Sequence, residues 1–140
     1  MTKFTGTKYE GRAIKIFRNQ GIFSAGLQPN ASPDLIIPAY KIGIEIKSTI
    51  SDRFYPSKNP TQYSYLKSQF ARDWNGWDSY YMIYFLHSHV WKVYSTSFHT
   101  PFKDMEGMDL DTFIQAIQES HKIWVHRERE RNHEGGNNED

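Results

Sequence analysis

Cysteine is absent from this 140-residue chain. Its absence excludes a disulfide scaffold, a thiolate zinc site and a cysteine nucleophile, although it fits either redox compartment. No stretch of roughly 18 apolar residues occurs, so the sequence predicts no membrane-spanning segment. Residues 1–6 lack the apolar core of a secretory signal, which favours an intracellular, cytoplasmic location. The length and the 38% hydrophobic content are typical of one compact domain.

Charge is unevenly distributed along the chain, although the net value is only +1. Residues 1–72 hold 11 Lys or Arg and 4 Asp or Glu, whereas residues 73–140 hold 6 and 12. A basic half is typical of a protein that binds a polyanion, but the acidic half weakens that interpretation for the surface as a whole. Aromatic residues make up 16% of the chain, and most of them are expected in the core.

The hydrophobic pattern predicts alternating helices and strands in the order αβββαββα. Helices are expected over residues 7–20, from Asn59-Pro60 to Asn75-Gly76, and after a cap at Asp109 or Asp111. Strands are expected over residues 22–27, 34–38, 42–48, 80–85 and 90–94, the last two forming a hairpin. This order is typical of an α/β domain with a mixed sheet flanked by helices. The polar end, residues 131–140, is expected to be a disordered acidic tail.

The chemistry of this sequence is concentrated in two of the predicted strands. Asp34 opens one strand, and Glu45 and Lys47 alternate with isoleucines on the next, so the three side chains are expected on one face. Two carboxylates beside each other are suitable ligands for Mg²⁺, which binds a few carboxylates together with water and phosphate oxygens. Lys47 would hold the attacking water or stabilise charge on phosphorus. The arrangement therefore predicts hydrolysis of a phosphodiester.

A purely structural interpretation of these residues also exists. Charged residues that alternate with isoleucines are found on any half-exposed strand, and an aspartate after a proline is common in turns. Residues 34–47 are otherwise apolar enough for the middle of a sheet, where unpaired charges are costly. That combination favours the catalytic interpretation.

The same residues resemble the signature of the PD-(D/E)xK nuclease superfamily, through Pro33-Asp34 and Glu45-Ile46-Lys47. Residues 6–12, GTKYEGR, resemble the opening helix of the archaeal Holliday junction resolvases, and the likeness extends over about residues 6–95. It implies a restriction-endonuclease-like fold, with residues 1–130 as a single nuclease domain. Beyond Tyr94 nothing specific matches.

The resemblance implies a role for each residue of the site. The implied catalytic residues are Glu10, Asp34, Glu45 and Lys47. The implied ligands of Mg²⁺, with Mn²⁺ as a substitute, are Glu10, Asp34, Glu45 and the carbonyl of Ile46. The residues expected to contact the substrate are Lys8, Arg12, Ser32 and Gln62.

Two of these residues have structural alternatives. Glu10 stands third after Thr7, as in a capping box, but it also shares a helical stripe with Ala13 and Phe17 that would face the sheet. Gln62 stands third after Asn59 and would complete a similar cap. Both interpretations stay open at this point.

Other polar residues give weaker signals. Several cations near the predicted site would neutralise DNA phosphates, although a solvated helix face is the commoner role of any one lysine: Lys3, Lys8, Arg12, Lys15, Arg18, Arg53 and Lys58. His87 and His89 lack a third ligand at recognisable spacing, so a turn is favoured over a metal site. The four tryptophans are expected in the core or at an interface rather than as base-stacking platforms.

Together with the acids and the lysine, the resemblance implies a magnesium-dependent endonuclease that is expected to resolve four-way (Holliday) DNA junctions in recombination and repair. The resemblance and the need for two symmetric cuts imply a homodimer. One alternative is a nuclease of the same superfamily that nicks or cuts duplex, flapped or single-stranded DNA. A second alternative is a DNA-binding protein without catalytic activity. Fold and motif do not separate these, because substrate choice depends on surface shape.

Overall fold

The structure of the protein is a computed structural model that describes residues 2–28 and 31–138, with side chains described for residues 8–28, 31–123 and 126–131. A six-stranded sheet with strand order β1-β2-β3-β5-β6-β8 forms its centre, and β4 and β7 pair separately. The helices are α1 (Thr2–Asn19), α2 (Pro60–Ser64), α3 (Phe70–Asp73) and α4 (Leu110–Asn138). The strands are β1 (Ala25–Gly26), β2 (Leu35–Ile37), β3 (Ile42–Thr49), β4 (Arg53–Phe54), β5 (Asp78–Phe85), β6 (Val90–Ser95), β7 (Phe102–Lys103) and β8 (Met108–Asp109).

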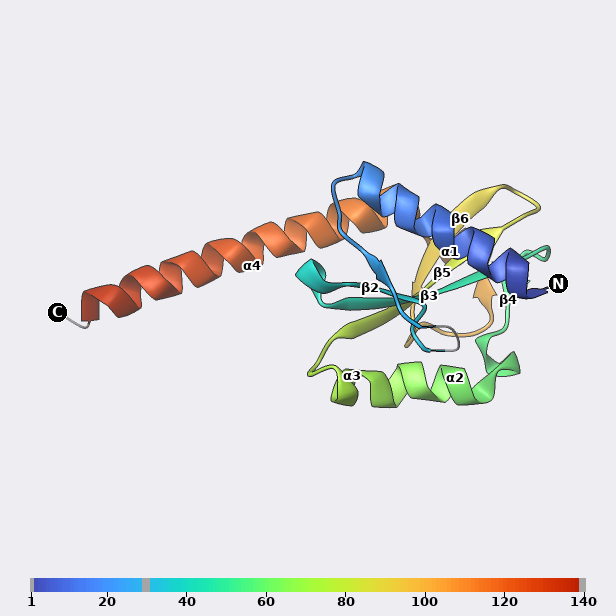
Figure 1. Ribbon diagram of the computed structural model, residues 1–140, viewed down its shortest axis with the longest axis horizontal. Helices are drawn as coiled ribbons and strands as arrows, with labels where there is room; N and C mark the ends of the chain where they lie inside the picture. Colours follow the sequence, from blue (N-terminus) through green and yellow to red (C-terminus); the bar gives the residue numbers. More distant parts are fainter. Residues whose placement is uncertain (1, 29–30, 139–140) are drawn as a thin grey trace.

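Helices cover both faces of the sheet (Figure 1), as the α/β pattern predicted. On one face α1 and the first turns of α4 pack on the isoleucines of β3 around Phe17 and Phe113. On the other face α2, α3 and the β4-β7 pair enclose a second core around Phe70, Tyr81 and Phe102. Strand β3 therefore lies between two hydrophobic layers, and α4 extends beyond them (Figure 1).

The sheet is mixed because β3 has an antiparallel neighbour on one side and a parallel neighbour on the other. β2 pairs antiparallel with β3, with Leu35 opposite Ile44. β5 runs parallel to β3, with Glu45 opposite Tyr81, and then forms the predicted hairpin with β6. Ile42, Ile44 and Ile46 are buried against α1 and α4, so the predicted apolar face of β3 is confirmed.

Gly43 allows close packing on the opposite face of β3. A Cβ atom at this position would lie 2.5 Å from the ring of Phe70 and 2.7 Å from the ring of Pro33. Real Cβ atoms do not approach other atoms so closely, and Phe70 is fully buried. Glycine is therefore required for the turn before β2 and the helix α3 to contact the same point of the strand.

Several predicted boundaries differ from the observed ones. Helix α1 begins at Thr2 rather than at Thr7, and only Ala25–Gly26 of the predicted strand 22–27 pairs in the sheet. Asn59 is a helix cap as predicted, because its Oδ1 accepts a hydrogen bond from the Gln62 amide at 3.3 Å. The helix that follows contains a π-helical turn over Tyr65–Gln69, which its sequence does not predict.

The C-terminal segment also differs from the prediction. Helix α4 continues over residues 131–138, where the sequence predicts a disordered tail, and residues 139–140 lie outside the described residues. Ion pairs along this helix, such as Arg131 with Glu128 at 2.9 Å and His126 with Glu130 at 3.0 Å, favour the helical state over a free chain. In the described part of the chain, no helix is both long and apolar enough to cross a bilayer.

Candidate active site

Asp34 lies directly beside the central strand. It precedes β2, and the antiparallel pairing of Leu35 with Ile44 brings its side chain next to the following part of β3. The Ile46 amide donates a hydrogen bond of 2.7 Å to Asp34 Oδ2. Because the amide and carbonyl of a strand residue face the same neighbour, the Ile46 carbonyl also faces the Asp34 side of β3. The predicted meeting of Asp34 and the Glu-x-Lys strand is therefore observed.

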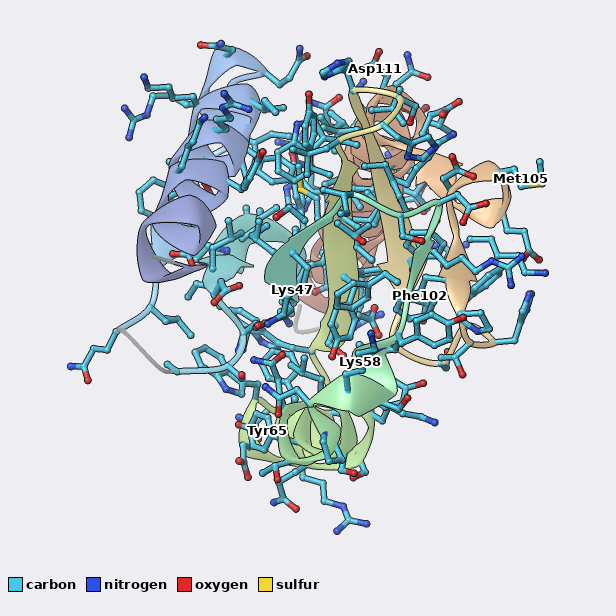
Figure 2. All side chains as sticks on the ribbon, turned by 90° about the vertical axis from the view of Figure 1, so that its right-hand side faces the viewer. Lys47, Lys58, Tyr65, Phe102, Met105 and Asp111 are labelled. Atoms are coloured by element: carbon cyan, nitrogen blue, oxygen red, sulfur yellow. The ribbon has the colours of Figure 1, made fainter. Side chains whose placement is uncertain are left out.

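Glu45 and Lys47 form an ion pair on the face of β3 opposite the isoleucines. The distance from Lys47 Nζ to Glu45 Oε2 is 3.4 Å, and the two side chains are 29% and 1% exposed. Figure 2 shows Lys47 near the centre of the molecule, between α1 and α2. The Glu45 carboxylate is therefore buried, whereas Lys47 is partly exposed to solvent.

Glu10 joins this group from α1. Since α1 begins at Thr2, Thr7 lies inside the helix and does not cap it, so the capping-box interpretation of Glu10 is wrong. The Glu10 carboxyl instead lies close enough to Asp34 to interact with it, since burial and then Asp34 raise the pKa of Glu10. The physical reason is the stripe that Glu10 shares with Ala13 and Phe17, which are buried against the sheet.

The three acids repel one another and are poorly solvated. Burial, followed by the charge of Asp34, raises the pKa of Glu45 to about 8, although Lys47 opposes the shift. Burial also raises the pKa of Asp34, against the hydrogen bond from Ile46 and the charge of Lys47. The pKa of Glu10 is raised by burial and then by Asp34. One lysine therefore does not balance the negative charge that this site carries when its acids are ionised.

The donor set fits a divalent cation. Glu45 Oε1 is buried and has no hydrogen-bond partner among the described residues, so one carboxylate oxygen is available as a ligand. Within the described residues, no group of three or more acidic or histidine side chains forms a complete metal cage. Mg²⁺ does not require one, because it keeps several waters and usually takes one or two carboxylates together with phosphate oxygens.

Ser32 and Gln62 contact each other beside Asp34. Gln62 Nε2 donates a hydrogen bond of 3.1 Å to Ser32 Oγ, whereas the backbone amide of Gln62 contacts the Asn59 cap. The side chain of Gln62 therefore does not complete a capping box. It connects α2 to the turn that carries Asp34.

Lys8 and Arg12 lie on the exposed side of α1. Arg12 Cζ lies 5.2 Å and Lys8 Nζ 6.0 Å from the centre of the Tyr9 ring. No described contact brings either cation to the acids. Lys3 lies outside the residues with described side chains, and Arg53 and Lys58 line a cavity of about 360 Å³ next to Lys47.

The histidines and tryptophans have structural contacts. His87 Nε2 lies 2.9 Å from Asp104 Oδ2, and His89 Nδ1 lies 3.3 Å from the Tyr84 hydroxyl. Three of the tryptophans pack against the two cores, as predicted: Trp74, Trp77 and Trp91. The side chain of Trp124 is outside the described residues.

Tyr81 is a site residue that the sequence did not reveal. It is only 1% exposed, it is the register partner of Glu45 on β5, and its hydroxyl has no partner among the described residues. Burial and the charge of Glu45 raise its pKa, so the hydroxyl keeps its proton. In the sequence, Tyr81 is one of several aromatic residues in a strand, and only the β3-β5 register places it beside an acid.

Comparison with known proteins supports the fold. No protein-family model and no curated protein matches this chain. A solved structure does: Hjc, a Holliday junction resolvase from the archaeal hyperthermophile Archaeoglobus fulgidus, is similar with a TM-score of 0.60 and 15% sequence identity. The match covers 76% of this chain and 92% of that chain. This protein therefore has the restriction-endonuclease-like fold that its sequence predicts, a six-stranded mixed sheet flanked by helices in a single domain.

Proposed function

We propose that this protein is a metal-dependent endonuclease that hydrolyses the phosphodiester backbone of DNA. The observation that carries the proposal is the convergence of Asp34, Glu45 and Lys47 at the middle of the sheet, with Glu10 beside them. Buried acids with raised pKa values are typical of functional sites. The fold shared with a solved Holliday junction resolvase adds support, although a fold alone does not determine function.

The residues present fit a bound Mg²⁺, or Mn²⁺ in its place. Asp34, Glu45 and the Ile46 carbonyl would hold the ion, and Glu10 would do so directly or through a water. When bound, such an ion polarises a phosphoryl oxygen and lowers the pKa of its water. The acids also need a cation for a separate reason, because their mutual repulsion otherwise favours a protonated and inactive state.

Lys47 would act on the attacking water. Its amine lies 3.4 Å from Glu45 Oε2 and its side chain is 29% exposed, so the amine is near both the acids and the solvent. From there it orients the water and stabilises the negative charge that develops on the phosphate. Ser32, held by Gln62, would contact the phosphate or its water.

We further propose that the substrate is a branched DNA, that the preferred substrate is a four-way junction, and that a homodimer makes the two cuts. The support is the fold likeness to a junction resolvase and the need for paired symmetric incisions. Lys8 and Arg12, exposed on α1, would add phosphate contacts that position DNA without reading its sequence.

A cleavage assay tests this proposal. The purified protein is offered a four-way junction, a linear duplex, a flap and a single strand with Mg²⁺, beside Asp34→Asn and Lys47→Ala. Asparagine keeps an oxygen for the Ile46 amide, so the Asp34 variant should fold. Lys122→Ala is the matched control, because Lys122 is exposed on α4.

Each result of that assay has a distinct meaning. Paired symmetric nicks in the junction alone, lost in both site variants and kept in the control, are the expected outcome. Cleavage of linear or flapped DNA would instead assign the site to a nicking, repair or restriction-type nuclease. DNA binding without any cleavage would refute the nuclease proposal and favour the non-catalytic alternative.

A further inference from the structure

A cationic cavity lies beside the acids, on the face of the sheet that carries Glu45. It has a volume of about 360 Å³ and is lined by the end of β3, the segment 51–59 and the start of α2. Lys47, Arg53 and Lys58 line it, and no Asp or Glu is among the described residues that do. A concave site with one sign of charge attracts ligands of the opposite sign, so this cavity suits an anion.

Two of the three cations, Arg53 and Lys58, have only weak interactions with their own neighbours. Arg53 Nε lies 3.6 Å from Asp52 Oδ1, and both of these side chains are largely exposed. Lys58 Nζ lies 5.4 Å from the centre of the Tyr55 ring and is exposed beside α2 (Figure 2). Exposed ion pairs contribute little, so these cations are available to a stronger anionic partner.

One residue that lines this cavity has a buried hydroxyl without a partner among the described residues. Tyr81 lines it, and its side chain is 1% exposed. The ring is enclosed by three aromatic neighbours, Phe54, Tyr63 and Phe102, with centroid distances of 6.0, 6.2 and 5.5 Å. No described group accepts a hydrogen bond from the hydroxyl. The packing fixes the ring, so the O–H group cannot swing out to solvent.

An unsatisfied buried hydroxyl is unfavourable in the free protein and is rare in native structures. A phenol O–H is a donor at neutral pH, and phosphate oxygens are strong acceptors. Arg53, Lys58 and a residue with an unused donor line the same cavity, and these are the groups that a phosphate needs. A sheet residue whose only role was packing would be served equally well by phenylalanine.

We propose that this cavity binds a backbone phosphate of the nucleic-acid strand, next to the one that is cut, with the Tyr81 hydroxyl as its buried hydrogen-bond donor. Arg53 and Lys58 supply the surrounding positive charge. The nature of the polymer rests on the proposed function, but the phosphate chemistry rests on the cavity alone. Tyr81 is then a substrate-binding residue and contributes affinity before any bond is broken.

The test measures binding without metal and without cleavage. A fluorescein-labelled single-stranded oligonucleotide is titrated with protein in EDTA at low salt, and anisotropy gives the Kd. Tyr81→Phe removes only the hydroxyl. Tyr84→Phe is the matched control, because Tyr84 lies on the same strand and its hydroxyl contacts His89. Thermal melting of each free variant is recorded in parallel.

The expected result is a Kd raised about tenfold in Tyr81→Phe, as for loss of one hydrogen bond to a charged group. The melting temperature of this variant should equal or exceed that of the wild type, since an unpartnered polar group is removed. Tyr84→Phe should keep the wild-type Kd. Lys58→Gln should lower the salt dependence of binding, whereas Lys67→Gln, outside the cavity, should not.

Three outcomes would overturn the inference. A lower melting temperature of Tyr81→Phe with unchanged Kd would make the hydroxyl a structural group. Inorganic phosphate could raise the melting temperature of the wild type but not of Tyr81→Phe, while both proteins bind the oligonucleotide equally well. That result would assign the cavity to free phosphate instead. If Tyr81→Phe binds the oligonucleotide with the wild-type Kd while the wild-type protein cleaves junctions, this inference is refuted and the proposed function stands.

Discussion

Substituting Glu45 by glutamine should stabilise the metal-free protein while it abolishes activity. Glu45 is 1% exposed, and its pKa is raised from 4.5 to about 8, chiefly by burial and then by Asp34. A carboxyl with a raised pKa binds its proton more tightly in the folded state than in the unfolded chain. Between pH 4.5 and about 8 the folded protein therefore holds more protons, and its stability falls as the pH rises.

The size of this effect follows from the same shift. Once Glu45 is ionised, moving its pKa from 4.5 to about 8 costs the folded state on the order of 5 kcal/mol. Glutamine carries no charge, so it removes this cost while it keeps nearly the same shape. The variant should match the wild type near pH 5 and exceed it in stability at pH 9, where its melting temperature should be higher by roughly 15 °C.

Thermal melting in EDTA at several values between pH 5 and pH 9 measures this difference. Glu119→Gln serves as the control, because Glu119 is 70% exposed and should leave the wild-type pH dependence unchanged. Parallel curves for the wild type and Glu45→Gln would refute the reasoning, and so would a variant that is less stable at pH 9. Cleavage with Mg²⁺ should be lost in Glu45→Gln at every pH.

Three further predictions concern the metal, the strand and the turn. Mg²⁺ binding, followed by calorimetry in buffers of different ionisation enthalpy, should release protons below pH 8, and its affinity should rise with pH up to about 8 as Glu45 ionises. Gly43→Ala should lower the free energy of unfolding by about 1–3 kcal/mol, because the added Cβ atom overlaps Phe70 and Pro33. Gly11→Ala should raise the free energy of unfolding by about 0.5–1 kcal/mol, because this position is in open space on α1. Denaturant titration measures both changes. Gln62→Ala should reduce kcat several-fold with little change in melting temperature, because it frees Ser32 but keeps the Asn59 cap to the backbone.

Much of the site was predictable because it depends on local pattern. The alternation of Glu45 and Lys47 with isoleucines fixes their shared face, and a short connection between two strands makes Asp34 their neighbour. Helical spacing predicted that Glu10 faces the sheet. The alternative, a capping role, was excluded only by the structure, in which α1 begins five residues before Thr7. Local pattern therefore identified the acids and the lysine.

The remainder depends on contacts between residues that are distant in the sequence. Tyr81 acquires its importance from the parallel register of β5 with β3, which no local pattern specifies. The contact between Gln62 and Ser32 spans 30 residues. The short pairs formed by β4, β7 and β8 have only two residues each, too few to give a periodic signal.

Strand β3 contributes to the hydrophobic core with one face and to the candidate site with the other, so both depend on its pairing register. Its even-numbered isoleucines build the core under α1 and α4, and Glu45 and Lys47 on its other face belong to the candidate site. A shift of the register by one residue would place Glu45 in the hydrophobic core under α1 and α4 and an isoleucine at the position of the acid. The pairing that forms the core under α1 and α4 therefore also brings Asp34, Glu45 and Lys47 of the candidate site together.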